Sequence, residues 1–80
     1  MYKRQLSHPL RFQIVVGLLK KQECNVHTMC EKLSADQPIV SQHLAVLRKA
    51  GIVETNRNGN QICYYIKDPK IKRLIKLLED

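Results

Sequence analysis

The sequence lacks the features of a membrane-spanning or exported chain. No apolar run approaches the roughly 18 residues of a spanning helix, and residues 1–5 are not followed by the apolar core of a signal peptide. A Gly-rich phosphate loop, an HExxH motif and an acid pair of recognisable spacing are also missing. These absences predict a cytoplasmic protein that is not an enzyme and does not span a membrane.

Cysteine and acidic residues are scarce. The 3 cysteines are odd in number and lack a CxxC pair, which favours reduced thiols over a disulfide framework. Against 7 Asp and Glu stand 14 Lys and Arg, so the net charge of +7 favours a polyanionic partner, either a nucleic acid or a membrane surface. A chain of 80 residues is one small domain that buries only about 60% of its unfolded surface, and dimerisation would bury more.

Apolar residues recur at helical spacing in the first half of the chain. Leu10, Ile14 and Leu18 predict a helix over residues 7–21. After a polar stretch, Asn25 can cap a short second helix. The apolar positions of this second helix are Val26, Met29, Cys30 and Leu33.

A third helix is expected to begin near Pro38, which suits a first helical turn, and to end at Gly51, which suits a left-handed cap. His43 lies between its two faces, where it can pack, bond locally or touch a phosphate. The predicted buried stripe is Val40, Leu44 and Leu47. The opposite side carries Pro38, Ser41, Gln42, Ala45 and Lys49.

A hairpin and a last helix follow. Residues 52–56 and 61–66 are rich in β-forming residues and flank Asn58-Gly59, a strong hairpin signal. The predicted tip is Arg57, Asn58, Asn60 and Gln61. The last helix opens at Asp68 and Pro69, and its apolar stripe is Ile71, Leu74, Ile75 and Leu78. Its other side carries Lys70, Lys72, Arg73 and Lys76.

The order of these elements predicts a mainly α fold with a β-hairpin wing, a winged helix-turn-helix. Two short helices joined by a tight turn form a helix-turn-helix, whose second helix enters the major groove of DNA. We expect one domain over residues 1–80, with the helix-turn-helix at about 26–50 and the wing at about 52–66. The expected partner is double-stranded DNA, and no membrane partner is expected.

The third helix carries groups suited to direct readout of bases. Gln42 can bond adenine in bidentate fashion, and Ser41 can bond several base edges. Arg48 and Lys49 more naturally meet phosphate, and Arg57 of the wing can enter the minor groove or clamp phosphates. The candidate DNA-binding residues are Gln37, Pro38, Ser41, Gln42, His43, Ala45, Arg48, Lys49, Arg57, Asn58 and Asn60.

Three stretches, LSHPLRFQIV, QPIVSQHLAVLRKAGIVE and RNGNQICYYI, resemble the ArsR/SmtB family of bacterial winged-helix repressors, from Leu6 to about Leu78. The resemblance implies a homodimeric repressor that binds a palindromic operator and leaves it when an inducer, often a metal ion, binds. The family dimerises through the helix before SHPLR and the C-terminal helix. Only residues 1–5 precede Leu6 here, so the helix at about 69–80 is expected to be the main dimerisation helix. The candidate dimer residues are Leu6, Leu10, Ile71, Leu74, Ile75 and Leu78.

The well-known metal ligands of that family are absent from this sequence. Asn25 and His27 stand where its arsenic, cadmium and lead sensors carry a cysteine pair, and the last helix has no His for a zinc-type site. Cys24, His27 and Cys30 could still bind zinc or copper with a fourth group, although Cys30 also belongs to an apolar stripe. We therefore expect no metal and no other cofactor.

Two other functions stay open at this point. The chain could be a thiol- or metal-responsive repressor of the same fold, acting through Cys24, His27, Cys30 or Cys63. It could also be a winged-helix protein-interaction module whose basic charge is incidental, because a fold does not determine a function.

Overall fold

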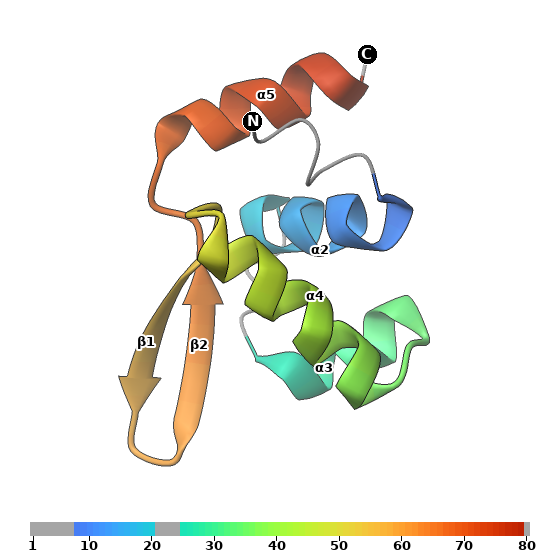
Figure 1. Cartoon of the computed structure of the whole chain (residues 1–80), viewed down its shortest axis with the longest axis vertical. Coiled ribbons are helices and arrows are strands. Elements are labelled where there is room, and N and C mark those ends of the chain that lie inside the picture. Colours follow the sequence, from blue (N-terminus) through green and yellow to red (C-terminus); the bar gives the residue numbers. More distant parts are fainter. Residues whose placement is uncertain (1–7, 21–24, 80) are drawn as a thin grey trace.

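The described part of the chain forms four α-helices and one β-hairpin (Figure 1). The computed structural model describes residues 8–20 and 25–79. This architecture confirms the predicted mainly α fold with a hairpin wing, and no described helix is long and apolar enough to cross a membrane. In chain order the elements are α2 (Pro9–Lys20), α3 (Val26–Leu33), α4 (Gln37–Lys49), β1 (Glu54–Asn58), β2 (Gln61–Tyr65) and α5 (Pro69–Glu79).

Helix α2 begins at Pro9 because His8 satisfies backbone donors of the first turn. The His8 carbonyl accepts from the Phe12 N–H at 3.0 Å, and the His8 Nδ1 atom accepts from the Leu10 N–H at 3.2 Å. Proline costs nothing in this place, since a first-turn N–H has no partner within the helix. Both ends of the predicted helix, 7–21, lie outside the described residues.

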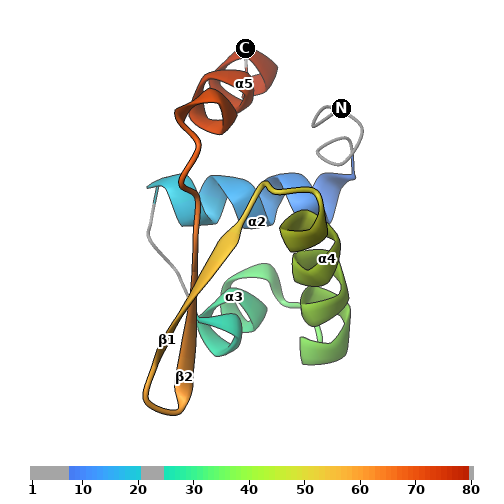
Figure 2. The same cartoon turned by 60° about the vertical axis from the view of Figure 1, so that its left-hand side comes forward.

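Helices α3 and α4 form the helix-turn-helix at the predicted positions. Asn25 caps α3, because its Oδ1 atom accepts from the Thr28 N–H at 2.7 Å. Ser34 ends α3 in the left-handed conformation, with a φ of 52°, and Asp36 precedes α4 as an extended cap. Pro38 lies in the first turn of α4, as predicted. Both views place α3 and α4 on the same side of α2 (Figures 1 and 2).

The end of α4 explains why the first wing strand starts later than predicted. Gly51 has a φ of 78°, a left-handed conformation that its missing Cβ permits. Its N–H donates to the Arg48 carbonyl at 3.0 Å, and the Ile52 N–H donates to the Leu47 carbonyl at 2.9 Å, the two bonds of a Schellman cap. Ile52 and Val53 are buried in the core and their N–H groups both donate to the Leu47 carbonyl, so β1 begins only after them.

The wing strands extend further toward the tip than the sequence predicts. Asn58 pairs with Gln61 as the last register position, so the two-residue loop is Gly59-Asn60. Gly59 has a φ of 64° and Asn60 has no positive φ, which fits a type II′ turn with glycine first. Arg57 and Asn58 therefore belong to the end of β1 beside the loop, and are not part of the loop itself.

The core lies around α2, which is packed between α5 on one side and α3 and α4 on the other (Figures 1 and 2). Leu10 packs against this core from α2, and Leu6 lies outside the described residues. The buried stripe of α4 is the predicted one. The buried apolar residues are Ile14, Val15, Leu18, Met29, Val40, Leu44, Leu47, Ile52, Val53, Ile71 and Ile75.

The apolar stripe of α5 is divided between the core and the surface. Ile71 is 0% exposed and Ile75 is 2% exposed within the chain itself, so the expectation that they form an exposed dimer face is wrong. Leu74 is half-buried, whereas Leu77 is 74% exposed and Leu78 is 40% exposed. Helical periodicity shows which side of a helix turns inward, but it does not tell whether the covering surface is the same chain or a second copy.

Candidate nucleic-acid interface

The exposed side of α4 presents mostly polar and small side chains away from the core, with Ile39 as an exposed large apolar side chain near its start. Val40, Leu44 and Leu47 are fully buried beneath it, so α4 is fixed to the domain along one side. Amide, hydroxyl and methyl groups suit the donors, acceptors and methyl groups of the DNA major groove. Each predicted outer residue of this helix is exposed: Gln37, Pro38, Ser41, Gln42, Ala45, Arg48 and Lys49.

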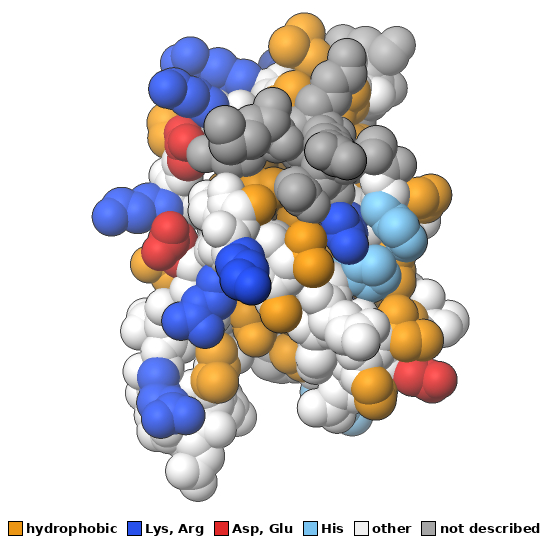
Figure 3. All heavy atoms as spheres, viewed as in Figure 1, with side chains coloured by type: hydrophobic (Ala, Val, Ile, Leu, Met, Phe, Trp, Pro, Cys, Tyr) orange, Lys and Arg blue, Asp and Glu red, His pale blue; other side chains and the backbone are white. Residues whose placement is uncertain are grey.

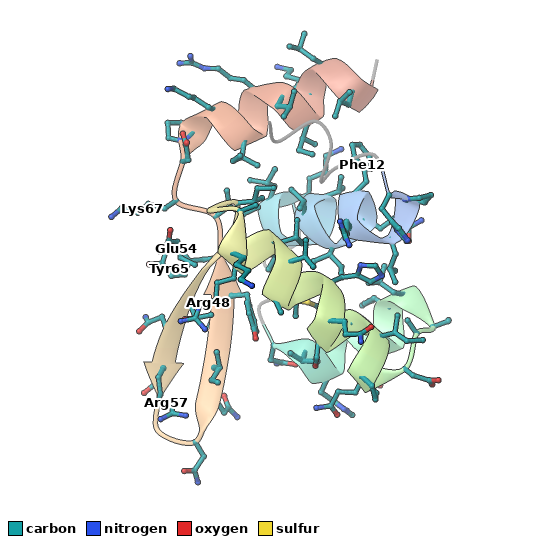
Figure 4. The ribbon with its side chains drawn as sticks, in the orientation of Figure 1. Phe12, Arg48, Glu54, Arg57, Tyr65 and Lys67 are labelled. Atoms are coloured by element: carbon teal, nitrogen blue, oxygen red, sulfur yellow. The ribbon has the colours of Figure 1, made fainter. Side chains whose placement is uncertain are left out.

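A shallow groove joins the C-terminal end of α4 to the hairpin. The strand register pairs Thr55 with Tyr64 and Arg57 with Ile62, which puts these four side chains on one face of the hairpin. Arg48 of α4 borders the same groove, whose volume is about 260 Å³ (Figure 4). We call these five residues the wing-side groove. Two guanidinium groups and two hydroxyl groups, all able to donate to phosphate oxygens, thus meet in one place.

The hairpin beyond this groove is polar and lacks acidic groups. Asn58 and Asn60 are exposed at its end, and residues 55–67 contain no Asp or Glu. Glu54 lies at the base of the hairpin near Lys67, away from the end that carries Arg57 (Figure 4). Lys and Arg side chains follow one edge of this face of the molecule from α5 to the hairpin (Figure 3). A polyanion could therefore approach the end of the hairpin without meeting a carboxylate of residues 55–67.

His43 is turned toward α2 and not toward the outer face of α4. It is half-buried, and its Nδ1 atom accepts a hydrogen bond from Arg11 Nε at 3.0 Å. The His8 ring lies against it, with 4.6 Å between the ring centroids. Burial lowers the pKa of His43 below its ordinary value of 6.5, and the positive charges of His8 and Arg11 lower it further. Of the roles considered for His43, the local bond is the one in this structure.

Three polar residues near this interface were not among the candidates taken from the sequence. Thr55 and Tyr64 could have been found from strand alternation, because they share a hairpin face with Arg57. No local sequence pattern identifies Arg11 as part of the interface, because its partner His43 lies 32 positions further along the chain.

The possible soft-metal ligands do not gather in the described part of the chain. Cys24 lies outside the described residues. The His27 side chain is 86% exposed, and its Nε2 atom lies 3.4 Å from the Glu31 carboxylate. Cys30 is partly buried against the core, and the Cys63 thiol donates to the Tyr64 carbonyl at 3.7 Å. Among residues 8–20 and 25–79, no group of three or more His, Cys, Asp or Glu is placed to hold a metal ion.

Known proteins resemble this chain along most of its length. The family model described as bacterial regulatory protein, arsR family, matches residues 8–55. The chain is 38% identical over 72 residues to the HTH-type transcriptional repressor SmtB of Mycobacterium tuberculosis (strain CDC 1551 / Oshkosh). That match covers 90% of this chain and 53% of the relative, so the chain spans about half of the length of this repressor.

Two solved structures share the fold. The transcriptional repressor BigR from Xylella fastidiosa has a TM-score of 0.84 at 40% identity, over 94% of this chain and 76% of that one. A homodimeric winged helix-turn-helix DNA-binding domain from Mycobacterium bovis has a TM-score of 0.81 at 26% identity, over 96% and 70%. The family match itself runs from the start of α2 into β1, which is more than half of the sequence. The chain therefore belongs to the arsR family of bacterial regulatory proteins.

Proposed function

We propose that this chain is a sequence-specific DNA-binding transcriptional repressor that acts as a homodimer on a palindromic operator in the bacterial cytoplasm. The observation that carries the proposal is the exposed polar face of α4, which is held on a buried stripe and bordered by the wing-side groove. In this function α4 enters the major groove, and the hairpin meets the minor groove or the backbone. The family and the repressor names of the relatives support it.

Base reading is assigned to the middle of the α4 face. The Gln42 amide can donate to and accept from one adenine edge, and this bidentate pairing rejects other bases. Ser41 has one hydroxyl that can either donate or accept, so it tolerates several base edges. Ala45 offers a methyl group to the methyl of thymine. All three side chains are exposed in the free protein, so none has to leave the core to reach DNA.

Backbone contacts are assigned to the basic residues at the edge of that face. Arg48 and Arg57 come from different elements but line the same groove, so one phosphate could receive hydrogen bonds from both. Lys49 is exposed beside them in the last turn of α4. Such contacts fix the register of the protein on DNA and contribute affinity without sequence preference. Asn58 and Asn60 at the hairpin end extend the contact toward the minor groove.

Dimerisation is assigned to α5. Its exposed apolar side chains are Leu77 and Leu78, next to the half-buried Leu74, and exposed leucines of this kind are a liability on a small monomer. The helix lies at the opposite end of the molecule from the hairpin loop (Figure 1). A second copy on this side would leave α4 and the wing uncovered. The homodimeric state of the Mycobacterium bovis domain supports the dimer itself.

Selection of binding sites from a random duplex library, followed by titration at several salt concentrations, tests the proposal. We expect enrichment of a palindromic sequence and a binding constant that falls with salt, with a log–log slope of about −0.9 for each phosphate contacted. A shuffled duplex of the same length is the control. No enrichment together with a flat salt dependence would reject the repressor and favour the protein-interaction module.

A further inference from the structure

A cluster of three basic side chains borders α4 on the side away from the hairpin. The Arg11 Nε–H donates to the Nδ1 atom of His43 at 3.0 Å and so joins the first turn of α2 to the middle of α4. The rings of His8 and His43 lie 4.6 Å apart, with their planes tilted by 50°. We call Arg11, His43 and His8 the α2-side cluster. Figure 3 shows histidine side chains gathered beside a basic one on this face, across α4 from the hairpin.

Among the described residues, the groups that act electrostatically on His43 are basic. They are His8, which precedes α2, and Arg11 in the first turn of α2, and both lower the pKa of His43. No acidic side chain of the described residues enters that balance. An anion that arrives at the cluster would therefore be attracted by the positive charge of Arg11. The first turn of α2, a helix of 12 residues, adds the positive end of its dipole nearby.

The cluster holds its arginine in a defined orientation. The Nδ1 atom of His43 accepts a hydrogen bond, so the ring is neutral and carries its proton on Nε2. Because a guanidinium is planar, binding its Nε–H to a fixed acceptor also fixes the plane of its other donors. The His8 ring is held in turn, since its Nδ1 atom accepts from the Leu10 N–H at 3.2 Å.

We propose that Arg11 donates to a DNA phosphate on the side of α4 opposite to the wing, and that His43 is a positioning residue that acts through Arg11. The inference rests on the proposed function, because it requires α4 to lie in the major groove. The major groove of DNA is bordered by a phosphate backbone on each side. If the wing-side groove, with Arg48 and Arg57, meets one backbone, the α2-side cluster on the other side of α4 would meet the other. The recognition helix is then anchored at both edges.

The first test is Arg11→Gln, which removes the charge. Affinity measured by fluorescence anisotropy should fall about tenfold, the usual effect of losing a hydrogen bond to a charged group. The loss should be the same for the selected and the shuffled duplex, and the salt slope should become shallower by about 0.9. Arg73→Gln is the matched control and should leave the slope unchanged, since Arg73 is an exposed residue of α5 and not of α4 or the hairpin. Arg11→Lys should retain the slope, because it keeps the charge.

The second test asks whether His43 acts through Arg11. His43→Leu removes the acceptor and should weaken binding, by less than Arg11→Gln. The double variant should bind no more weakly than Arg11→Gln alone, because His43 has nothing left to position. His43→Gln restores an oxygen acceptor and should recover affinity. By contrast, the effects of His43→Leu and Lys49→Gln should simply add.

The outcomes separate this inference from the proposed function. If the unmodified protein shows no salt-dependent binding, the proposed function fails and this inference fails with it. If the unmodified protein binds but Arg11→Gln leaves affinity and slope unchanged, only the phosphate contact is overturned. If Arg11→Gln acts as expected but its effect adds to that of His43→Leu, the positioning role of His43 is overturned.

Discussion

Helices α4 and α5 are both amphipathic, but their exposed sides differ in chemistry. The outer face of α4 carries Ser41, Gln42 and Ala45, whereas α5 exposes Leu77 and Leu78 near its C-terminal end. Hydrogen-bonding groups suit a polar ligand with a defined pattern of donors and acceptors, and exposed leucines suit an apolar protein surface. The difference supports the proposal that α4 meets DNA and α5 meets a second copy of the chain.

The two helices also lie on different sides of the molecule. Helix α2 stands between them, and the hairpin projects away from α5 (Figures 1 and 2). A dimer built on α5 would therefore leave α4 and the wing open to DNA. Substitutions on the exposed side of one helix should then alter the function of that helix and spare the other.

The largest effect is expected from the buried side of α4. Leu44 is fully buried, so Leu44→Ala should lower the free energy of unfolding by about 2–5 kcal/mol, from lost burial and the cavity that remains. Leu77→Ala should cost no more than about 0.5 kcal/mol in the monomer, because this side chain is 74% exposed. Urea unfolding at low protein concentration measures both. Equal losses would mean that the two leucines do not differ in burial as described.

The next effect concerns dimerisation. Replacing Leu77 and Leu78 together by Lys should weaken the dimer at least tenfold, since burying each leucine is worth about 1.5–3 kcal/mol. Sedimentation at micromolar concentrations should show the shift toward monomer, with the monomer still folded. The matched control is Lys70→Ala, an exposed change on the same helix that should leave the dimer intact. A stable dimer in the doubly substituted protein would remove α5 as the interface.

On the exposed side of α4, two substitutions should separate reading from anchoring. Gln42→Ala should reduce discrimination at one base position by about 1–3 kcal/mol, because the bidentate pairing with adenine is lost. Lys49→Ala should weaken binding to every sequence alike and make the salt slope shallower by about one. Competition binding with single-position variants of the selected duplex measures both effects. Unchanged preference in Gln42→Ala would deny this residue a reading role.

The smallest effect is a pH dependence of stability from His43. Its pKa is lowered in the folded chain by burial and then by His8 and Arg11. As the pH falls through 6.5, the unfolded chain therefore takes up a proton before the folded chain does, and the free energy of unfolding decreases until the pH is below the folded pKa. Above this window His43 is neutral in both states and the effect vanishes.

The measurement is urea unfolding of the unmodified protein and of His43→Gln at about pH 7.5 and about pH 5.5. The unmodified protein should lose more stability on acidification, because glutamine does not titrate. The comparison cancels the contributions of the other titrating groups. A constant difference between the two proteins would show that His43 has the same pKa in both states.

Much of this fold follows from local signals in the sequence. The spacing of Val40, Leu44 and Leu47 predicts the buried side of α4, and the structure buries all three. Asn25 predicts the start of α3 because its side chain can satisfy a first-turn donor, and it does so. Gly51 predicts the end of α4, where the backbone adopts a positive φ. Each of these signals depends on neighbours within one or two helical turns.

The parts that the sequence did not predict depend on contacts between distant segments. The partner of Ile71 and Ile75 is the core of the same chain, and the spacing of these residues along α5 contains no information about that choice. The hydrogen bond from Arg11 to His43 likewise cannot be predicted from the sequence of either helix alone. The wing strands differ from the prediction for a local reason. Gly59 occupies the first position of the two-residue loop, so Asn58 is the last residue of β1.

The most direct test of the central claim is a hydroxyl-radical footprint on the selected duplex. A dimer that places one α4 in the major groove of each half-site predicts two protected segments related by two-fold symmetry. Their centres should be about 10 base pairs apart, one helical turn of DNA, or a multiple of this distance. A single protected segment, or protection without two-fold symmetry, would contradict a dimeric repressor that reads DNA through α4.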